Sequence, residues 1–438
     1  MPNLSLKSRF ASLFSTRDSP GYTMVEQEST AHSTIGSPHV QKELTSVQNA
    51  LAYISFMLVG MSRYAVALEL LYRCSEFLEL KGVEYLRKLD KCVFYYREFT
   101  QHLSAHKGNL ALRSSIALGF NIVLFFVIAG STFTNFSANA YFGFIIFMCI
   151  LSACSTGLMQ NGAFGFCGLF PTIHAQAIMT GQGIAGILPS VVQIILLTTS
   201  KSKHDAKNHL EEASARIAFA YFLTASAISL LAFFANALLI RISKDLPPHP
   251  FITTTSDSTS FHRLWKLFKQ LLPLSISVVA VFLVTLSIFP GITSSVTPVS
   301  SRPLRKDIFI SLGFLVWNAS DLLGRTVAGL KPVSKALVPH PRYISILTWS
   351  RVIFIPLFIL CNIYDKGSVI KSDVFFFFLL TLNGLSNGLL GSLCIMSALE
   401  MSNNRQDAGG FMSLMLCLGL ALGSCVSFAV VAVAKSIR

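Results

Sequence analysis

The sequence predicts an all-α polytopic membrane protein, and three observations support that fold class. Hydrophobic residues make up 52% of the 438 residues and charged residues only 13%, which is about half the charged fraction of a typical soluble domain. The mean hydropathy is +0.59. Beyond residue 112 the chain consists largely of apolar runs of about 20 residues, the length that crosses a bilayer as a helix. These runs are too long and too uniformly apolar for barrel strands, so we expect a helical bundle.

The first quarter of the chain predicts no complete membrane span. Residues 1–48 are rich in Ser and Thr, and we expect a disordered tail without a signal-peptide core. In segment 49–112 the apolar run Leu51–Met61 has only eleven residues, too few to cross a bilayer. The stretch Arg63–Lys107 is charged throughout, so we predict that it stays outside the bilayer.

Nine apolar spans follow. Segment 113–240 predicts an N-terminal helical bundle and segment 271–438 a C-terminal one. The loop between them, 241–270, is the best cytoplasmic candidate because it holds five Lys and Arg residues, although other loops are nearly as basic. Pro171, Pro189 and Pro356 mark bends or span boundaries. The predicted spans are 113–133, 140–162, 172–199, 214–240, 271–291, 308–330, 343–362, 373–398 and 408–434.

Charge and cysteine usage exclude several kinds of partner. The net charge of +14 is spread over loops and both ends, which favours membrane lipids as counter-ions and predicts no nucleic acid. The nine cysteines include no Cys-x-x-Cys pair and lie at no ligand spacing from a histidine, so we expect packing roles and neither metal nor cofactor. No nucleophile–base pair lies in the spans, so we do not expect an enzyme.

One predicted span, 308–330, carries two full charges. Four residues spaced by four, three and four lie on one helix face, and these are Phe314, Asn318, Asp321 and Arg325. Asp321 lies about 13 Å from the end of the span, too deep for a short side chain to reach water. The face either holds a self-contained Asp–Arg pair that locks packing, or lines a polar pathway. Asn318 favours the pathway, because packing alone needs no third polar group.

Other spans carry amides at depth. Gln160 ends the stretch "SACSTGLMQ", and Asn383 and Asn387 lie one turn apart. A lone buried amide is typical of contacts between helices, whereas several in one bundle indicate an aqueous cavity. The glycines of "NGAFGFCGLF" and "MTGQGIAGI" favour close helix packing and do not form a phosphate-binding loop.

Five motifs in order resemble those of the equilibrative nucleoside transporters. They are "MQNGAFGFCGLFP", "MTGQGIAGI", "WNASDLLGRT", "LSNGLLGSLCIM" and "AGGFMSLMLCLGLALGSCVSF". The resemblance extends from about residue 113 to the C-terminus. It implies a major-facilitator-like helical bundle of eleven spans, six followed by five. It also implies facilitative transport of nucleosides or nucleobases by alternating access, without a cofactor.

The resemblance also implies roles for the polar residues. Gln160 matches a glutamine that hydrogen-bonds the base, and Asp321 and Arg325 match a pair that holds the ribose hydroxyls. Asn318 belongs to the same polar face, and Phe314 faces the same cavity. The chemistry is compatible, because an amide can pair with a base edge and a carboxylate can accept from hydroxyl groups.

The N-terminal third departs from the family plan. "LAYISFMLVGMS" begins like a first span, but the charged stretch after it replaces the rest of the first two spans. A shifted reading frame, altered splicing or a divergent cytosolic helix would each explain this. The resemblance therefore leaves an alternative, a transport-inactive or regulatory variant. We expect a monomer in the plasma membrane or in a vacuolar or lysosomal membrane.

Overall fold

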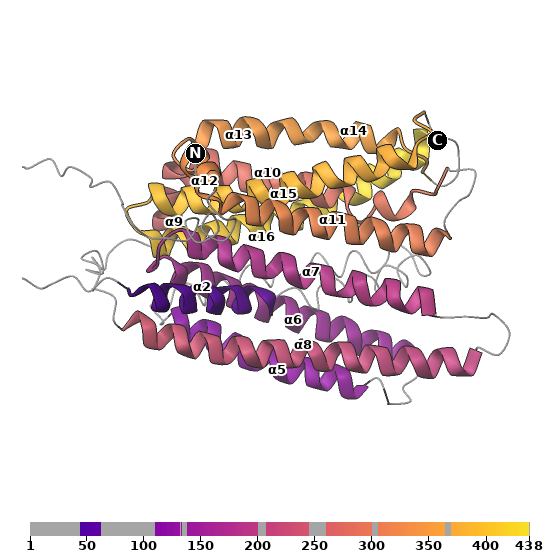
Figure 1. The fold of residues 1–438 in the computed structure, drawn as a ribbon, viewed down its shortest axis with the longest axis horizontal. Helices are drawn as coiled ribbons and strands as arrows, with labels where there is room; N and C mark the ends of the chain where they lie inside the picture. Colours follow the sequence, from indigo (N-terminus) through magenta and orange to yellow (C-terminus); the bar gives the residue numbers. More distant parts are fainter. Residues whose placement is uncertain are drawn as a thin grey trace, which may run out of the picture.

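The computed structural model is a helical bundle in two layers (Figure 1). It describes residues 44–62, 110–131, 133, 138–199, 207–244, 260–299, 305–363 and 369–437. The lower layer of the figure holds the N-terminal helices: α2 (Ser46–Met61), α5 (Leu110–Ser131), α6 (Ala138–Cys167), α7 (Ile173–Thr199) and α8 (Lys207–Ser243).

The upper layer holds the C-terminal helices (Figure 1). They are α9 (Ser260–Gln270), α10 (Leu272–Ile288), α11 (Lys306–Ala328), α12 (Lys331–Leu337), α13 (Pro341–Ser350), α14 (Phe354–Ile359), α15 (Asp373–Met401) and α16 (Arg405–Ile437), with short 3-10 turns η1 (Thr293–Ser295) and η2 (Arg351–Ile353). We call the two layers the N-half and the C-half.

Nine helical segments in the described residues are long and apolar enough to cross a membrane, one for each predicted span. The prediction of nine spans and a polytopic all-α fold is therefore confirmed. Several helices run past the apolar stretch, as α16 does by starting at Arg405, because intrahelical hydrogen bonds continue outside the hydrocarbon. The charged stretch 63–107 lies outside the described residues.

Helix α2 packs inside the N-half although it is short. Its sixteen residues rise about 24 Å, less than the roughly 30 Å hydrocarbon thickness. Ala52, Phe56 and Val59 are buried, and the helix packs against α7 and α8. The Phe56 ring meets Phe170 edge-on with 5.1 Å between centroids. The apolar run before the charged stretch is thus part of the bundle core.

The span predicted at 343–362 is broken. It comprises α13, the 3-10 turn η2 and α14, which contains Pro356. Proline lacks an amide hydrogen, and its ring clashes with the carbonyl four residues earlier, here Val352 in η2. The helix is thus interrupted by a 3-10 turn shortly before Pro356, and Arg351 begins this interruption.

The two halves contact each other along α7–α11 and α6–α16. Glycines make this approach possible. A Cβ atom at Gly168, which directly follows α6, would lie 2.6 Å from the backbone nitrogen of Gln406, and one at Gly409 of α16 would meet the carbonyl oxygen of Phe164. The backbones of α6 and α16 are therefore in direct contact across the interface between the halves.

Candidate functional site

Asp321 and Arg325 form a buried ion pair on α11. The Nε of Arg325 donates to Oδ2 of Asp321 at 2.6 Å, and the side chains are 2% (Arg325) and 4% (Asp321) exposed. The residues are one helical turn apart, so the helix itself brings them together. Two ionisable side chains are thereby buried in the C-terminal part of an apolar span, with Arg325 in its last turn. Ionisable residues inside a span usually mark a binding site or a pathway.

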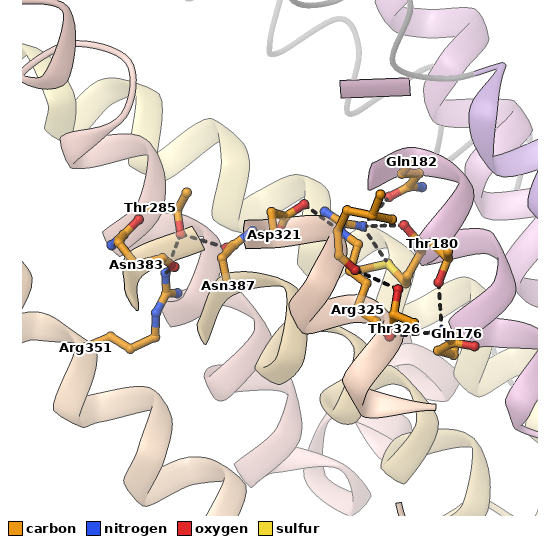
Figure 2. Close-up of polar contacts among 12 residues, drawn as sticks. Gln176, Thr180, Gln182, Thr285, Asp321, Arg325, Thr326, Arg351, Asn383 and Asn387 are labelled. Carbon is orange, nitrogen blue, oxygen red and sulfur yellow. Dashed lines mark hydrogen bonds and ion pairs between the residues drawn. The ribbon is translucent and has the colours of Figure 1, made fainter. Parts of the chain in front are cut away.

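The pair has partners on two other helices, as Figure 2 shows. Nδ2 of Asn387 on α15 donates to Oδ1 of Asp321 at 2.7 Å. Nη1 of Arg325 donates across the interface between the halves to the carbonyl oxygen of Met179 on α7 at 2.9 Å, and lies 3.4 Å from Oε1 of Gln182. The charged pair is thus hydrogen-bonded both within the C-half and to the N-half. It is therefore not a self-contained pair confined to α11.

Asn318 and Phe314 extend the same helix face. Nδ2 of Asn318 donates to the Phe314 carbonyl at 2.9 Å and reaches Oγ of Ser190 on α7 at 3.4 Å. Phe314 is partly buried; its ring lies 4.9 Å from that of Phe289, and it lines a small hollow with Thr293, Ile310, Gly313 and Phe376. Asn318 therefore faces the interface between the halves, and Phe314 offers an aromatic surface beside it.

Gln160 lies on α6 of the N-half and faces α16 of the C-half. Its Nε2 has two long contacts on α16, 3.5 Å to the Ser413 carbonyl and 3.7 Å to Sγ of Cys417. Its Oε1 is buried and has no hydrogen-bond partner among the described residues. None of the contacts found among these residues joins Gln160 to Asp321 or Arg325, although Gln160 and Arg325 each contact the opposite half.

Gln176 links three helices beside the ion pair, and Figure 2 shows it next to Thr180 and Arg325. Its Oε1 accepts from the Tyr53 hydroxyl on α2 at 2.8 Å. Its Nε2 donates to the Arg325 carbonyl on α11 at 2.9 Å and to Oγ1 of Thr180 at 2.7 Å. The short helix α2 is thereby connected through one side chain to the helix that carries the charged pair.

The sequence reasoning missed several residues of this network, notably Arg351, Thr285 and Gln182. Arg351 had a readable signal, because it is an ionisable residue inside the predicted span 343–362. Thr285 is a neutral residue without a distinguishing local pattern, whereas Gln182 lies inside the motif "MTGQGIAGI", which was interpreted only through its glycines. Trp317 on α11 packs within the C-half: it stacks on Phe289 at 4.2 Å and donates to Oδ1 of Asn383.

The described residues contain no group of three His, Cys, Asp or Glu side chains placed to hold a metal ion. The candidate site presents hydrogen-bonding groups. One carboxylate, one guanidinium and several amides can accept from hydroxyl groups and donate to ring or carbonyl oxygens. These groups suit a neutral, polar ligand rich in hydrogen-bonding atoms.

Comparisons of the sequence with known proteins all find similarity to nucleoside transporters. A family model described as "Nucleoside transporter" matches residues 145–244 and 248–432. Human equilibrative nucleoside transporter 1 is 27% identical over 378 residues, which cover 78% of this chain and 79% of that protein. The rat protein of the same name is 26% identical over 348 residues, covering 70% and 73% of the two chains. Nucleoside transporter FUN26 of Saccharomyces cerevisiae is 26% identical over 387 residues, covering 75% and 72%.

A solved structure supports the architecture. The major facilitator superfamily transporter FucP, in its outward conformation, superposes with a TM-score of 0.56 at 12% sequence identity. The match covers 90% of this chain and 98% of that one. At this identity the likeness concerns the fold alone, and it confirms the major-facilitator-like bundle expected from the sequence.

Proposed function

Because the chain belongs to the nucleoside transporter family, we propose that it carries nucleosides, or the nucleobases they contain, across a membrane by facilitative transport. The chain is a multi-pass membrane protein of a transporter family and not an enzyme. The two halves meet along α7–α11 and α6–α16. Rocking of one half against the other would expose a site between them to each side of the membrane in turn, as in alternating access.

The observation that carries the proposal is the buried Asp321–Arg325 pair at the interface between the halves. We assign the ribose hydroxyls to this pair, because a carboxylate accepts from hydroxyl groups and a guanidinium donates to their oxygens. Asn318 and Phe314 are assigned to the same ligand from the same helix face. Gln160 is assigned to the base, because its free Oε1 can accept from a base N–H group.

The test is uptake by an Arg325→Ala variant reconstituted in vesicles. The loss of a charged hydrogen bond to a ligand costs about 1.5–3 kcal/mol, so we expect uridine uptake at low concentration to fall roughly 10- to 150-fold. Arg325→Lys should recover only part of it, because lysine lacks the planar fork. Arg305→Ala is the matched control, since Arg305 is exposed at the start of α11 and pairs with Asp307.

Uptake at the parent rate by folded, correctly inserted Arg325→Ala protein would exclude the ribose assignment. Loss of uptake in both the Arg325 and the Arg305 variants would indicate a general effect on the helix.

We also propose that the protein acts as a monomer in the plasma membrane or in a vacuolar or lysosomal membrane. The support is that the polar contacts of the site come from the two halves of one chain. Fluorescence of a tagged chain with organelle markers, and the mass of the detergent-solubilised protein, would test the two statements.

A further inference from the structure

A third charge, Arg351, is buried in the C-half and has no role in the function proposed above. It begins the 3-10 turn between α13 and α14 and is 2% exposed. Four contacts satisfy its guanidinium: Ser386 Oγ at 3.0 Å, the Val281 carbonyl at 2.7 Å, Thr285 Oγ1 at 2.9 Å and the Asn383 carbonyl at 3.2 Å. All four acceptors are neutral. Desolvating an arginine among neutral groups is costly, so its presence calls for a function.

Hydrogen bonds connect Arg351 to Asp321 through two side chains (Figure 2). Nη2 of Arg351 lies 2.9 Å from Oγ1 of Thr285, and that hydroxyl lies 2.7 Å from Oδ1 of Asn387. Nδ2 of Asn387 in turn donates to Oδ1 of Asp321 at 2.7 Å. Thr285 and Asn387 are both 2% exposed, so the connection is shielded from solvent.

Chemistry fixes the direction of every bond in this chain. A guanidinium can only donate, so Thr285 must accept from Arg351. The carboxylate of the ion pair requires a donor, so the amide nitrogen of Asn387 points at Asp321 and its oxygen at Thr285. The single Thr285 proton has two acceptors in reach, Oδ1 of Asn387 at 2.7 Å and the Val281 carbonyl of its own helix at 2.8 Å. The Val281 carbonyl already accepts from Nη1 of Arg351, whereas Oδ1 of Asn387 has no other donor in the described part of the chain to relieve the contact between two oxygens. The proton is therefore assigned to the Asn387 bond. Every donor therefore points from Arg351 toward Asp321, an order in which successive bonds strengthen one another.

We propose that Arg351 is a positioning residue for substrate recognition, acting through Thr285 and Asn387 to hold the Asp321 carboxylate in place. We call the hydrogen-bonded series Arg351–Thr285–Asn387 the relay. The inference rests on the proposed function, because the carboxylate that the relay holds is the group assigned to the ribose. If the relay is broken, Asn387 can turn its amide and Asp321 loses one of its two anchors. The expected consequence is weaker recognition of the ribose hydroxyls, with contacts to the base unchanged.

The relay is broken most gently at Thr285. Thr285→Val has nearly the same shape but no hydroxyl, whereas Thr285→Ser keeps the hydroxyl. Thr348→Val is the matched control, because Thr348 is equally buried in the same half and its hydroxyl bonds the Ile344 carbonyl of its own helix. Uptake of uridine and of 2′,3′-dideoxyuridine, which lacks the 2′ and 3′ hydroxyls of the ribose, is measured for each variant at equal amounts of inserted protein.

We expect Thr285→Val to raise the KM for uridine about 3- to 10-fold, the effect of one hydrogen bond, with the KM for dideoxyuridine unchanged. Thr285→Ser should restore most of the uridine affinity, and Arg351→Lys should give a partial loss for uridine only. In an Asp321→Asn background the Thr285→Val effect should disappear, because the two substitutions act on one group.

Two results would overturn the inference in different ways. If Asp321→Asn distinguishes uridine from dideoxyuridine but Thr285→Val affects both alike, or neither, then the relay does not position the carboxylate and the ribose assignment stands. If Asp321→Asn itself fails to distinguish the two substrates, then the ribose assignment is wrong and the inference fails with it.

Discussion

Gln160 is the candidate residue with the clearest spare hydrogen-bonding capacity. Its Oε1 is buried without a partner among the described residues, and its Nε2 contacts on α16 are long, at 3.5 and 3.7 Å. A buried amide oxygen without a donor costs about 1–3 kcal/mol. A base with an N–H group at this position would remove that cost. Gln160 would then recognise the base and not the sugar.

Replacing Gln160 by Leu should therefore change the ranking of substrates. We expect the largest increase in KM for the nucleoside whose base donates to the amide, by about 3- to 10-fold, and smaller changes for the others. Competition of adenosine, inosine and uridine for uptake in the variant measures this. Equal losses for all three would assign Gln160 to helix packing.

The sequence predicted the charged pair but not its surroundings. A spacing of four residues on one helix is local information, so Asp321 and Arg325 could be placed together in advance. Their partners Asn387 and Met179 are 66 and 146 residues away from the residues they contact. Those contacts depend on how helices are arranged in the bundle, which no local pattern contains.

Glycines on the helices decide which elements can come together. A Cβ at Gly388 of α15 would meet the Asp321 carbonyl and lie 2.8 Å from the Arg325 nitrogen, so this glycine sets α11 against α15. Gly409 does the same between the halves, where its position meets Phe164 of α6. Gly419, ten residues further along α16, packs within the C-half, where an added Cβ would lie 2.8 Å from the Val279 carbonyl oxygen.

Gly409→Ala should shift the balance between conformations. The added methyl group acts as a wedge between α6 and α16, and overpacking costs about 1–3 kcal/mol. The ratio of open to closed forms at this end should therefore rise about fivefold or more. The readout is faster maleimide labelling of a Gln406→Cys probe, together with slower uptake.

Gly419→Ala is the control for this wedge, because it crowds α10 and α16 within one half. It should lower the thermal stability without accelerating labelling of the same probe. Equal acceleration in both variants would mean that Gly409 affects the fold rather than the contact between halves.

The elements themselves were largely predictable, because each membrane span is a long apolar run whose length is set by the bilayer. The break in the span 343–362 was visible only as Pro356, and the position of the 3-10 turn at Arg351 was not. A proline shows that a helix is weakened, but it does not show that the Arg351 side chain at the interruption donates to carbonyls of the neighbouring helices α10 and α15.

At the scale of the whole molecule, each half reaches into the other. Arg325 of the C-half bonds a carbonyl of the N-half, and Gln160 of the N-half approaches a carbonyl of the C-half. Helix α2 takes part through the Tyr53–Gln176 bond, which leads to the Arg325 carbonyl. The N-terminal region should therefore influence transport even though the polar site lies elsewhere.

Placing two full apolar spans in the N-terminal region should increase the rate of transport. We compare this chain with a version in which two apolar spans of about 20 residues stand in place of the segment from the start of α2 to residue 107. The restored form should take up nucleosides faster at equal surface level, because α2 alone is too short to wall the full depth of the bundle. Equal rates would show that the charged stretch replaces those spans functionally.

The buried charges of the described spans do not cancel. Asp321 contributes one negative charge, whereas Arg325 and Arg351 contribute two positive ones, all on the C-half. A membrane voltage of 100 mV acts on one charge crossing the full bilayer with about 2.3 kcal/mol. Even a displacement through a tenth of the electric field then changes the energy of reorientation by roughly 0.2 kcal/mol. The conformational equilibrium of a transporter of uncharged substrates would therefore depend on voltage. The voltage leaves the final substrate concentrations equal on both sides, but it sets the side of the membrane to which the empty site opens more often.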